Sequence, residues 1–233
     1  MNILNYMMGK WVYGHSLPIQ ALEKMRIQPG DTLCIIGCGY GDTAIHAARR
    51  FGSRVHAYDI HPQLVEKTRV RVSSVEWVRV AYINPYEDVC QAGGHCLIEV
   101  VLSYLRSPGD FLCRMADLHR FVGVVEITAE GYLDGEHYFG GGVRLRSDFE
   151  WREIFNSLGL EILWDGGHNL SLMRKFWEDL RIKPLTTFHD MAKTTSTSWR
   201  RAEARDAIKR FRQLFSEYGD LLKCKYYIVR RCV

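Results

Sequence analysis

Residues 34–42 read CIIGCGYGD, with three glycines at alternate positions of one short stretch. The apolar run Thr32–Ile36 leads into it, and residues 43–51 after it carry small and apolar side chains at helical spacing. Glycine lets a backbone turn sharply and lets a ligand come close to the main chain. The stretch therefore predicts a strand, a ligand-binding turn and a helix in succession.

An acidic residue follows at the spacing of a nucleoside-binding site. Asp59 ends the next expected strand, 20 residues after Gly39, where α/β proteins place the carboxylate that accepts hydrogen bonds from ribose hydroxyls. The turn reads G-x-G-x-G and continues into Asp42, whose carboxylate would cap the helix and repel a pyrophosphate. S-adenosylmethionine carries a sulfonium and an ammonium group and no phosphate, so the pattern favours this cofactor.

Strands and helices are expected to alternate along the chain, which is typical of a parallel sheet covered by helices. The composition and periodicity predict strands at 32–36, 54–58, 75–80, 96–101, 123–127, 160–164 and 225–230. They predict helices at 43–51, 62–70, 108–119, 147–158, 169–181 and 199–222, the last one strongly amphipathic. These elements indicate an α/β fold.

The amino-acid composition is typical of a soluble globular protein. The chain has 233 residues, of which 47% are hydrophobic and 25% charged, and it lacks both a membrane-length apolar run and the features of a signal peptide. Its seven cysteines show no paired spacing, and its nine histidines show no H-x-x-x-H pattern. We therefore expect a cytoplasmic protein with reduced thiols, no metal site and no membrane span.

The segment Asp31–Arg69, with its glycine turn and spaced acid, resembles the first two motifs of class I S-adenosylmethionine-dependent methyltransferases. The similarity is to the small-molecule branch that includes ubiquinone, sterol, tocopherol and sarcosine methyltransferases and cyclopropane fatty-acid synthases. Residues 11–16 (WVYGHS), 101–108 (VLSYLRSP) and 155–160 (FNSLGL) resemble further motifs of that branch. The resemblance implies a Rossmann-like sheet of seven strands, mostly parallel, with helices on both faces and an antiparallel last strand.

The resemblance also implies a single methyltransferase domain over residues 1–233. Its N-terminal segment (1–28) would cover the cofactor, and residues 166–222 would form a C-terminal insertion. Ile35 and Ala81 depart from the family, which usually has acids at these two positions, near the methionine and adenine ends of the cofactor. Pattern and resemblance together imply cofactor contacts by Tyr13, Gly37, Cys38, Gly39, Gly41, Asp59, Ile60, Ala81, Tyr82 and Glu99.

Two histidines are the candidate catalytic residues. Methyl transfer needs alignment of the reactants and, for some acceptors, a base. The resemblance places the acceptor pocket between the N-terminal segment, the glycine-rich loop 129–142 and the insertion. His137 and His168 lie in these regions and titrate near neutral pH, so each is a candidate base. The alternatives are that both are ordinary loop histidines, or that the reaction needs no base.

The leading functional hypothesis is S-adenosylmethionine-dependent methyl transfer to the O, N or C atom of a small molecule. One alternative is a protein of the same fold that binds the cofactor but catalyses another reaction or serves as a binding subunit, because of Ile35 and Ala81. A second alternative is an RNA methyltransferase, because residues 193–233 carry 11 Lys and Arg against 4 Asp and Glu. The absence of a separate RNA-binding module or catalytic signature speaks against nucleic acid as a partner.

Overall fold

The computed structural model describes residues 16–84, 93–130, 143–169, 213 and 217–232. Its strands are β1 (Thr32–Ile36), β2 (Arg54–Asp59), β3 (Val78–Tyr82), β4 (His95–Glu99), β5 (Phe121–Ala129), β6 (Leu160–Asn169) and β7 (Leu222–Arg231). Its helices are α2 (Ser16–Lys24), α3 (Asp42–Phe51), α4 (Pro62–Val72), the 3-10 turn η2 (Leu102–Tyr104), α5 (Pro108–Leu118) and α7 (Asp148–Ser157). None of the helices described is long and apolar enough to cross a membrane.

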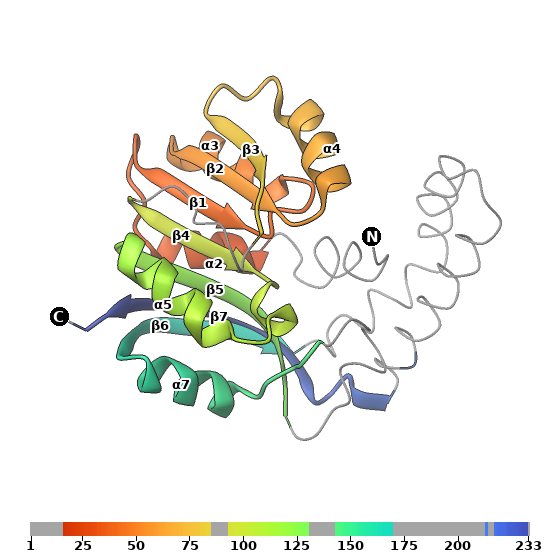
Figure 1. The fold of residues 1–233 in the computed structure, drawn as a ribbon, viewed down its shortest axis with the longest axis vertical. Coiled ribbons are helices and arrows are strands. Elements are labelled where there is room, and N and C mark those ends of the chain that lie inside the picture. The colour runs from red at the N-terminus through yellow and green to blue at the C-terminus, as the bar shows by residue number, and fades with distance from the viewer. Residues whose placement is uncertain (1–15, 85–92, 131–142, 170–212, 214–216, 233) are drawn as a thin grey trace.

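All seven strands form one sheet in the order β3-β2-β1-β4-β5-β7-β6. Strands β1 to β5 are parallel to one another, whereas β7 runs antiparallel to both β5 and β6. Figure 1 shows α5 and α7 in front of this sheet and α2 and α3 behind it. The predicted Rossmann-like architecture, with helices on both faces and an antiparallel last strand, is confirmed.

Two apolar layers hold the sheet between its helices. One joins α2, α3 and α4 to residues such as Ile35 and Leu97, and the other joins α5 and α7 to residues such as Ile36 and Ile98. Successive residues within β1, and likewise within β4, thus point into opposite layers, as the two-residue period of a strand requires. The buried strands read as continuous apolar runs because both faces of a parallel sheet are covered.

The structure corrects the predicted bounds of the N-terminal segment and of the C-terminal insertion. Helix α2 was not predicted, yet Leu17, Ala21, Leu22 and Met25 are fully buried at helical spacing. The described part of the N-terminal segment is therefore a core element. Strand β6 continues to Asn169, so residues 166–169 belong to the sheet and not to the insertion. Strand β7 begins at Leu222, which we had placed in a helix.

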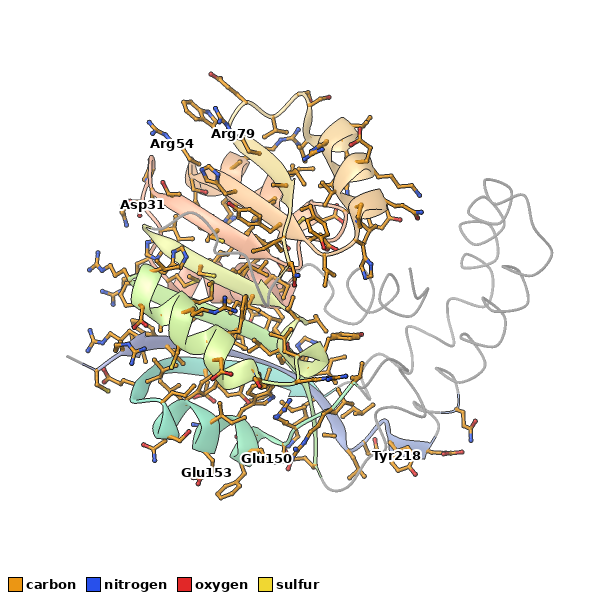
Figure 2. The ribbon with its side chains drawn as sticks, viewed as in Figure 1. Asp31, Arg54, Arg79, Glu150, Glu153 and Tyr218 are labelled. Atoms are coloured by element: carbon orange, nitrogen blue, oxygen red, sulfur yellow. The ribbon has the colours of Figure 1, made fainter. Side chains whose placement is uncertain are left out.

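The sheet has two edges of different character. The amino edge is where β1, β2 and β3 begin, and Figure 2 shows Asp31, Arg54 and Arg79 on that side of the molecule. The carboxyl edge is where the same strands end, and it carries the glycine turn that follows β1. In open α/β sheets, ligands bind at the carboxyl edge where the strand order reverses. Here that point lies between β1 and β4.

Candidate functional site

The glycine turn, residues 37–41, connects β1 to α3 beside the end of β4. All three of its glycines have positive φ angles, which residues other than glycine rarely adopt. A Cβ on Gly37 would lie 2.4 Å from the carbonyl oxygen of Glu99, and a Cβ on Gly41 would lie 2.7 Å from the Cγ2 of Thr68. A Cβ on Gly39 would meet nothing within 4 Å, so this glycine faces open space.

The N–H groups of the turn are already engaged inside the protein. Gly37 and Cys38 both donate to the carbonyl of Tyr58, at 2.9 Å each, and Gly39 donates to Asp59 Oδ2 at 3.0 Å. These three N–H groups therefore have partners within the protein. A phosphate needs such donors, so their engagement disfavours a phosphate at the turn.

Asp59 stands at the end of β2, where the spacing predicted it. Its Oδ1 accepts a hydrogen bond from the His61 N–H at 2.9 Å, and its side chain thereby fixes both the glycine turn and the start of α4. The residue is 6% exposed, and burial raises the pKa of its carboxyl group while these N–H donors lower it. The carboxylate retains lone pairs for further donors, because two oxygens offer about four acceptor sites.

Apolar surface lies next to Asp59. Ile60 follows Asp59 directly and is 45% exposed. Tyr82, which pairs in register with Asp59 from the end of β3, is 48% exposed. Ala81 adjoins them in β3, where the family usually has an acid. Exposed large apolar side chains beside a buried carboxylate offer a platform on which a planar ring can stack.

Glu99 ends β4 at the point where the strand order reverses. Its Oε2 accepts a hydrogen bond from the Thr43 hydroxyl at 3.2 Å, whereas its Oε1 is buried without a hydrogen-bond partner. Burial, with the negative charges of Asp42 and Asp59 adding to it and the Thr43 hydrogen bond opposing it, raises the pKa of its carboxyl group to about 8. The next residue, Val100, has a φ of 55°, which is unfavourable for a β-branched side chain.

Acidic groups thus gather around the turn. Asp59 and Glu99 raise the pKa of the Cys38 thiol in addition to the larger effect of burial, so the thiol stays protonated. A protonated, buried thiol is a poor nucleophile. Asp42 begins α3 and pairs with Arg71. The arrangement suits a ligand that brings positive charge.

The loop after β4 is held by a buried carboxyl group that sequence reasoning missed. Glu126, in the middle of β5, accepts hydrogen bonds of 2.7 Å from the Leu102 N–H and the Ser103 hydroxyl. Burial raises its pKa to about 7. An acid inside the apolar run 121–129 is the signal that could have indicated this role. Glu126 fixes η2, the segment that follows Glu99.

Of the two candidate bases, only His168 lies within the described residues, and it is far from the glycine turn. His168 lies in β6 opposite Cys224, so its prediction as a loop residue is wrong. It is at the carboxyl edge but four strands away from β1, and burial lowers its pKa. His137 and Tyr13 lie outside the described residues.

Three possible metal ligands lie together elsewhere. Cys34, Cys96 and His119 place their ligand atoms within 4.8 Å of one another, although no metal site was expected. The two cysteines are register partners in β1 and β4 and face the layer of α5 and α7. They therefore lie on the other side of the sheet from Glu99 and are no part of the site at the turn.

Sequence comparisons agree with this geometry. Residues 19–95 match the mycolic acid cyclopropane synthetase family. The chain is also similar to the ribosomal protein L11 methyltransferase of Bacillus cereus strain AH820, with 38% identity over 81 residues, which are 35% of this chain and 23% of that protein. The chain thus spans less than a quarter of the length of this curated relative.

Solved structures resemble nearly the whole chain. The mycolic acid cyclopropane synthase CmaA1, complexed with SAH and CTAB, has a TM-score of 0.75 at 15% identity, covering 92% of this chain and 82% of that one. The 4+2 cyclase SpnF has a TM-score of 0.75 at 17% identity, covering 94% and 81%. The chain has the Rossmann-like fold of class I S-adenosylmethionine-dependent methyltransferases, and residues 19–95 resemble them in sequence.

Proposed function

We propose that this chain binds S-adenosylmethionine at the turn 37–41 and transfers its methyl group to a small-molecule acceptor. The observation that carries the proposal is a glycine turn whose N–H groups at 37–39 have partners within the protein, beside two carboxyl groups, the buried Asp59 at the end of β2 and Glu99 where the strand order reverses. This arrangement favours a nucleoside ligand with positive charge and no phosphate.

Each part of the cofactor has a chemically matching region. The ribose hydroxyls would donate to Asp59, whose carboxylate lies at the tip of β2. The adenine ring would lie along the exposed side chains of Ile60 and Tyr82, next to Ala81. The amino-acid part would cross Gly39, because this glycine alone among the three of the turn faces open space. Tyr13 would contact the cofactor from the N-terminal segment.

The chemistry asks little of the protein beyond alignment. When bound, the sulfonium group supplies a methyl carbon that is already activated for in-line displacement. The chain's own residues would hold this carbon against the acceptor and exclude water. His137 and His168 remain our proposed bases for an acceptor that must lose a proton. A neutral amine or an alkene would need neither histidine.

A second candidate function has a specific observation in its favour. SpnF, a 4+2 cyclase by its name, is as similar in fold to this chain as the cyclopropane synthase is. This chain also has Ile35 and Ala81 where the methyltransferase family usually has acids. A protein that binds the cofactor and catalyses a reaction without methyl transfer is therefore the alternative. Formation of S-adenosylhomocysteine with any acceptor would decide for methyl transfer.

Calorimetry with S-adenosylmethionine tests the binding site. Asp59→Asn keeps the size of the side chain but replaces one acceptor oxygen with a donor, so we expect a loss of affinity of about thirtyfold. Asp110→Asn is the matched control, since this exposed aspartate lies in the first turn of α5 and away from the turn 37–41. Unchanged affinity in Asp59→Asn would refute the ribose contact, and no binding by the unaltered protein would refute the proposed function.

A further inference from the structure

The acid that the family usually has at position 35 has a counterpart on the neighbouring strand. Ile35 of β1 pairs in register with Leu97 of β4, and both side chains lie in the layer of α2 and α3. Side chains two residues apart on a strand point to the same face. Glu99 therefore lies on the same face as Ile35, one step nearer the carboxyl edge.

Contacts at Glu99 confirm this placement. Its side chain accepts a hydrogen bond from Thr43, in the first turn of α3, which covers that face. Its main-chain carbonyl lies directly behind Gly37, where a Cβ would come within 2.4 Å. Its second oxygen, Oε1, is buried without a partner. A buried oxygen of this kind is costly unless a ligand satisfies it.

We propose that Glu99 supplies from β4 the acid that position 35 lacks, and that it binds the amino group of the cofactor's amino-acid part. This inference rests on the proposed function. The amino group of S-adenosylmethionine is a cationic donor, and it is the part of the ligand that would cross the turn beside Glu99. A buried carboxyl oxygen that meets such a donor gains a charge-assisted hydrogen bond.

The charges around Glu99 decide its protonation. The groups that act on it are Asp42 of α3, whose partner is Arg71, Asp59 of β2 and the Thr43 hydroxyl, whereas the nearby thiol of Cys38 is neutral. With its pKa at about 8, the carboxyl group of Glu99 is mostly protonated at pH 7 in the empty site. An ammonium group beside it favours the ionised form. Binding therefore transfers the proton from the carboxyl group to solvent.

Calorimetry in buffers of different ionisation enthalpy measures this proton directly. At pH 7, the unaltered protein should release close to one proton on binding S-adenosylmethionine, and the same on binding S-adenosylhomocysteine, which has the amino group but no sulfonium. With 5′-methylthioadenosine, which lacks the amino-acid part, it should release none. Glu99→Gln should bind the first two ligands about 10- to 100-fold more weakly without proton release, and should bind the third unchanged.

The possible outcomes separate this inference from the function on which it rests. If the unaltered protein binds S-adenosylmethionine without releasing a proton and no more tightly than 5′-methylthioadenosine, Glu99 does not bind the amino group, although the proposed function stands. Release with S-adenosylmethionine but not with S-adenosylhomocysteine would overturn the amino-group contact in favour of the sulfonium. No binding of either ligand would overturn both proposals. The measurement on the unaltered protein holds even if Glu99→Gln fails to fold.

Discussion

The two edges of the sheet surround their buried titratable side chains with different neighbours. At the amino edge, His95 Nε2 lies 3.3 Å from Asp31 Oδ2, and the His95 ring stacks on Phe121. At the carboxyl edge, the negative charge of Asp59 helps to raise the pKa of Glu99, and one oxygen of Glu99 has no partner. Each group has one buried polar atom without a partner, His95 Nδ1 and Glu99 Oε1. Strand β4 therefore begins with a histidine beside an acid of opposite charge type and ends with a carboxyl group beside acids of its own type.

The difference indicates which edge is organised for a ligand. Complementary pairs stabilise a fold without further help, whereas like charges and backbone strain, such as that of Val100, cost stability unless something else binds there. A protein retains such a cost where function requires it. Changes at the amino edge should therefore alter stability, and changes at the carboxyl edge should alter binding.

The largest effect is expected from Gly94→Ala at the amino edge. The new Cβ would lie 2.0 Å from the carbonyl oxygen of Thr32, and the backbone would have to move. We expect a loss of about 3 kcal/mol or more in the free energy of unfolding, from the clash and the positive φ together. Urea unfolding measures it. Gly159→Ala is the matched control, because its φ of 66° equals the 67° of Gly94 within a degree and its Cβ meets nothing.

Gly159→Ala should lose only about 1 kcal/mol, the cost of the left-handed backbone conformation. The difference between the two variants then isolates the clash with Thr32. Folded Gly94→Ala protein, where it can be obtained, should bind S-adenosylmethionine with unaltered affinity. Equal stability of the two variants would show that the start of β4 adapts easily and would remove the contrast between the edges.

At the carboxyl edge, Gly39→Val should abolish binding and leave the chain folded. The side chain would enter the open space that we assign to the cofactor, so we expect a loss of affinity of at least about 100-fold. The conformational cost to stability is about 1–2 kcal/mol. Gly159→Val carries the same cost away from the turn and should bind normally. Calorimetry and thermal unfolding on both variants test this, and normal binding by folded Gly39→Val would refute the position of the cofactor.

The fold was largely predictable because local patterns and the resemblance agreed. The run 32–36 and the apolar face of 43–51 gave β1 and α3 to within one residue. Helix α2 escaped prediction because its apolar residues follow an aromatic-rich segment that we had assigned to ligand binding. Residues 166–169 were misjudged because two glycines suggest a loop, whereas here they let β6 pass close to β7.

The geometry of the site was predictable only where its residues lie in consecutive elements of the sequence. Asp59 could be placed from its spacing to Gly39, because both lie in consecutive elements of one unit. The engagement of the turn's N–H groups by Tyr58 and Asp59 depends on the register of β1 against β2. The meeting of Glu99 with Thr43 depends on a contact across 56 residues of sequence. Such contacts follow from the packing of the whole sheet.

The smallest predicted effect is a contrast in how the two edges respond to pH. Burial lowers the pKa of His95, with Asp31 opposing it, so the unfolded chain binds the proton better and stability falls as pH drops below about 6.5. The pKa of Glu99 is raised from 4.5 to about 8, so the stability it contributes is fully present below about pH 4.5, declines as the pH rises, and is lost above about pH 8. Each proton changes the free energy of unfolding by at most about 1.4 kcal/mol per pH unit.

Thermal unfolding of the cofactor-free protein between pH 5 and pH 9 would separate the two groups. His95→Gln should remove the loss of stability that begins as the pH falls below about 6.5, whereas Glu99→Gln should remove the decline of stability as the pH rises from about 4.5 to about 8. S-adenosylmethionine at saturation should also reduce this decline of stability with rising pH in the unaltered protein, because the ionised Glu99 then has a cationic partner. A Glu99→Gln profile identical to that of the unaltered protein would mean that Glu99 is already ionised in the empty site, and the contrast between the edges would then rest on geometry alone.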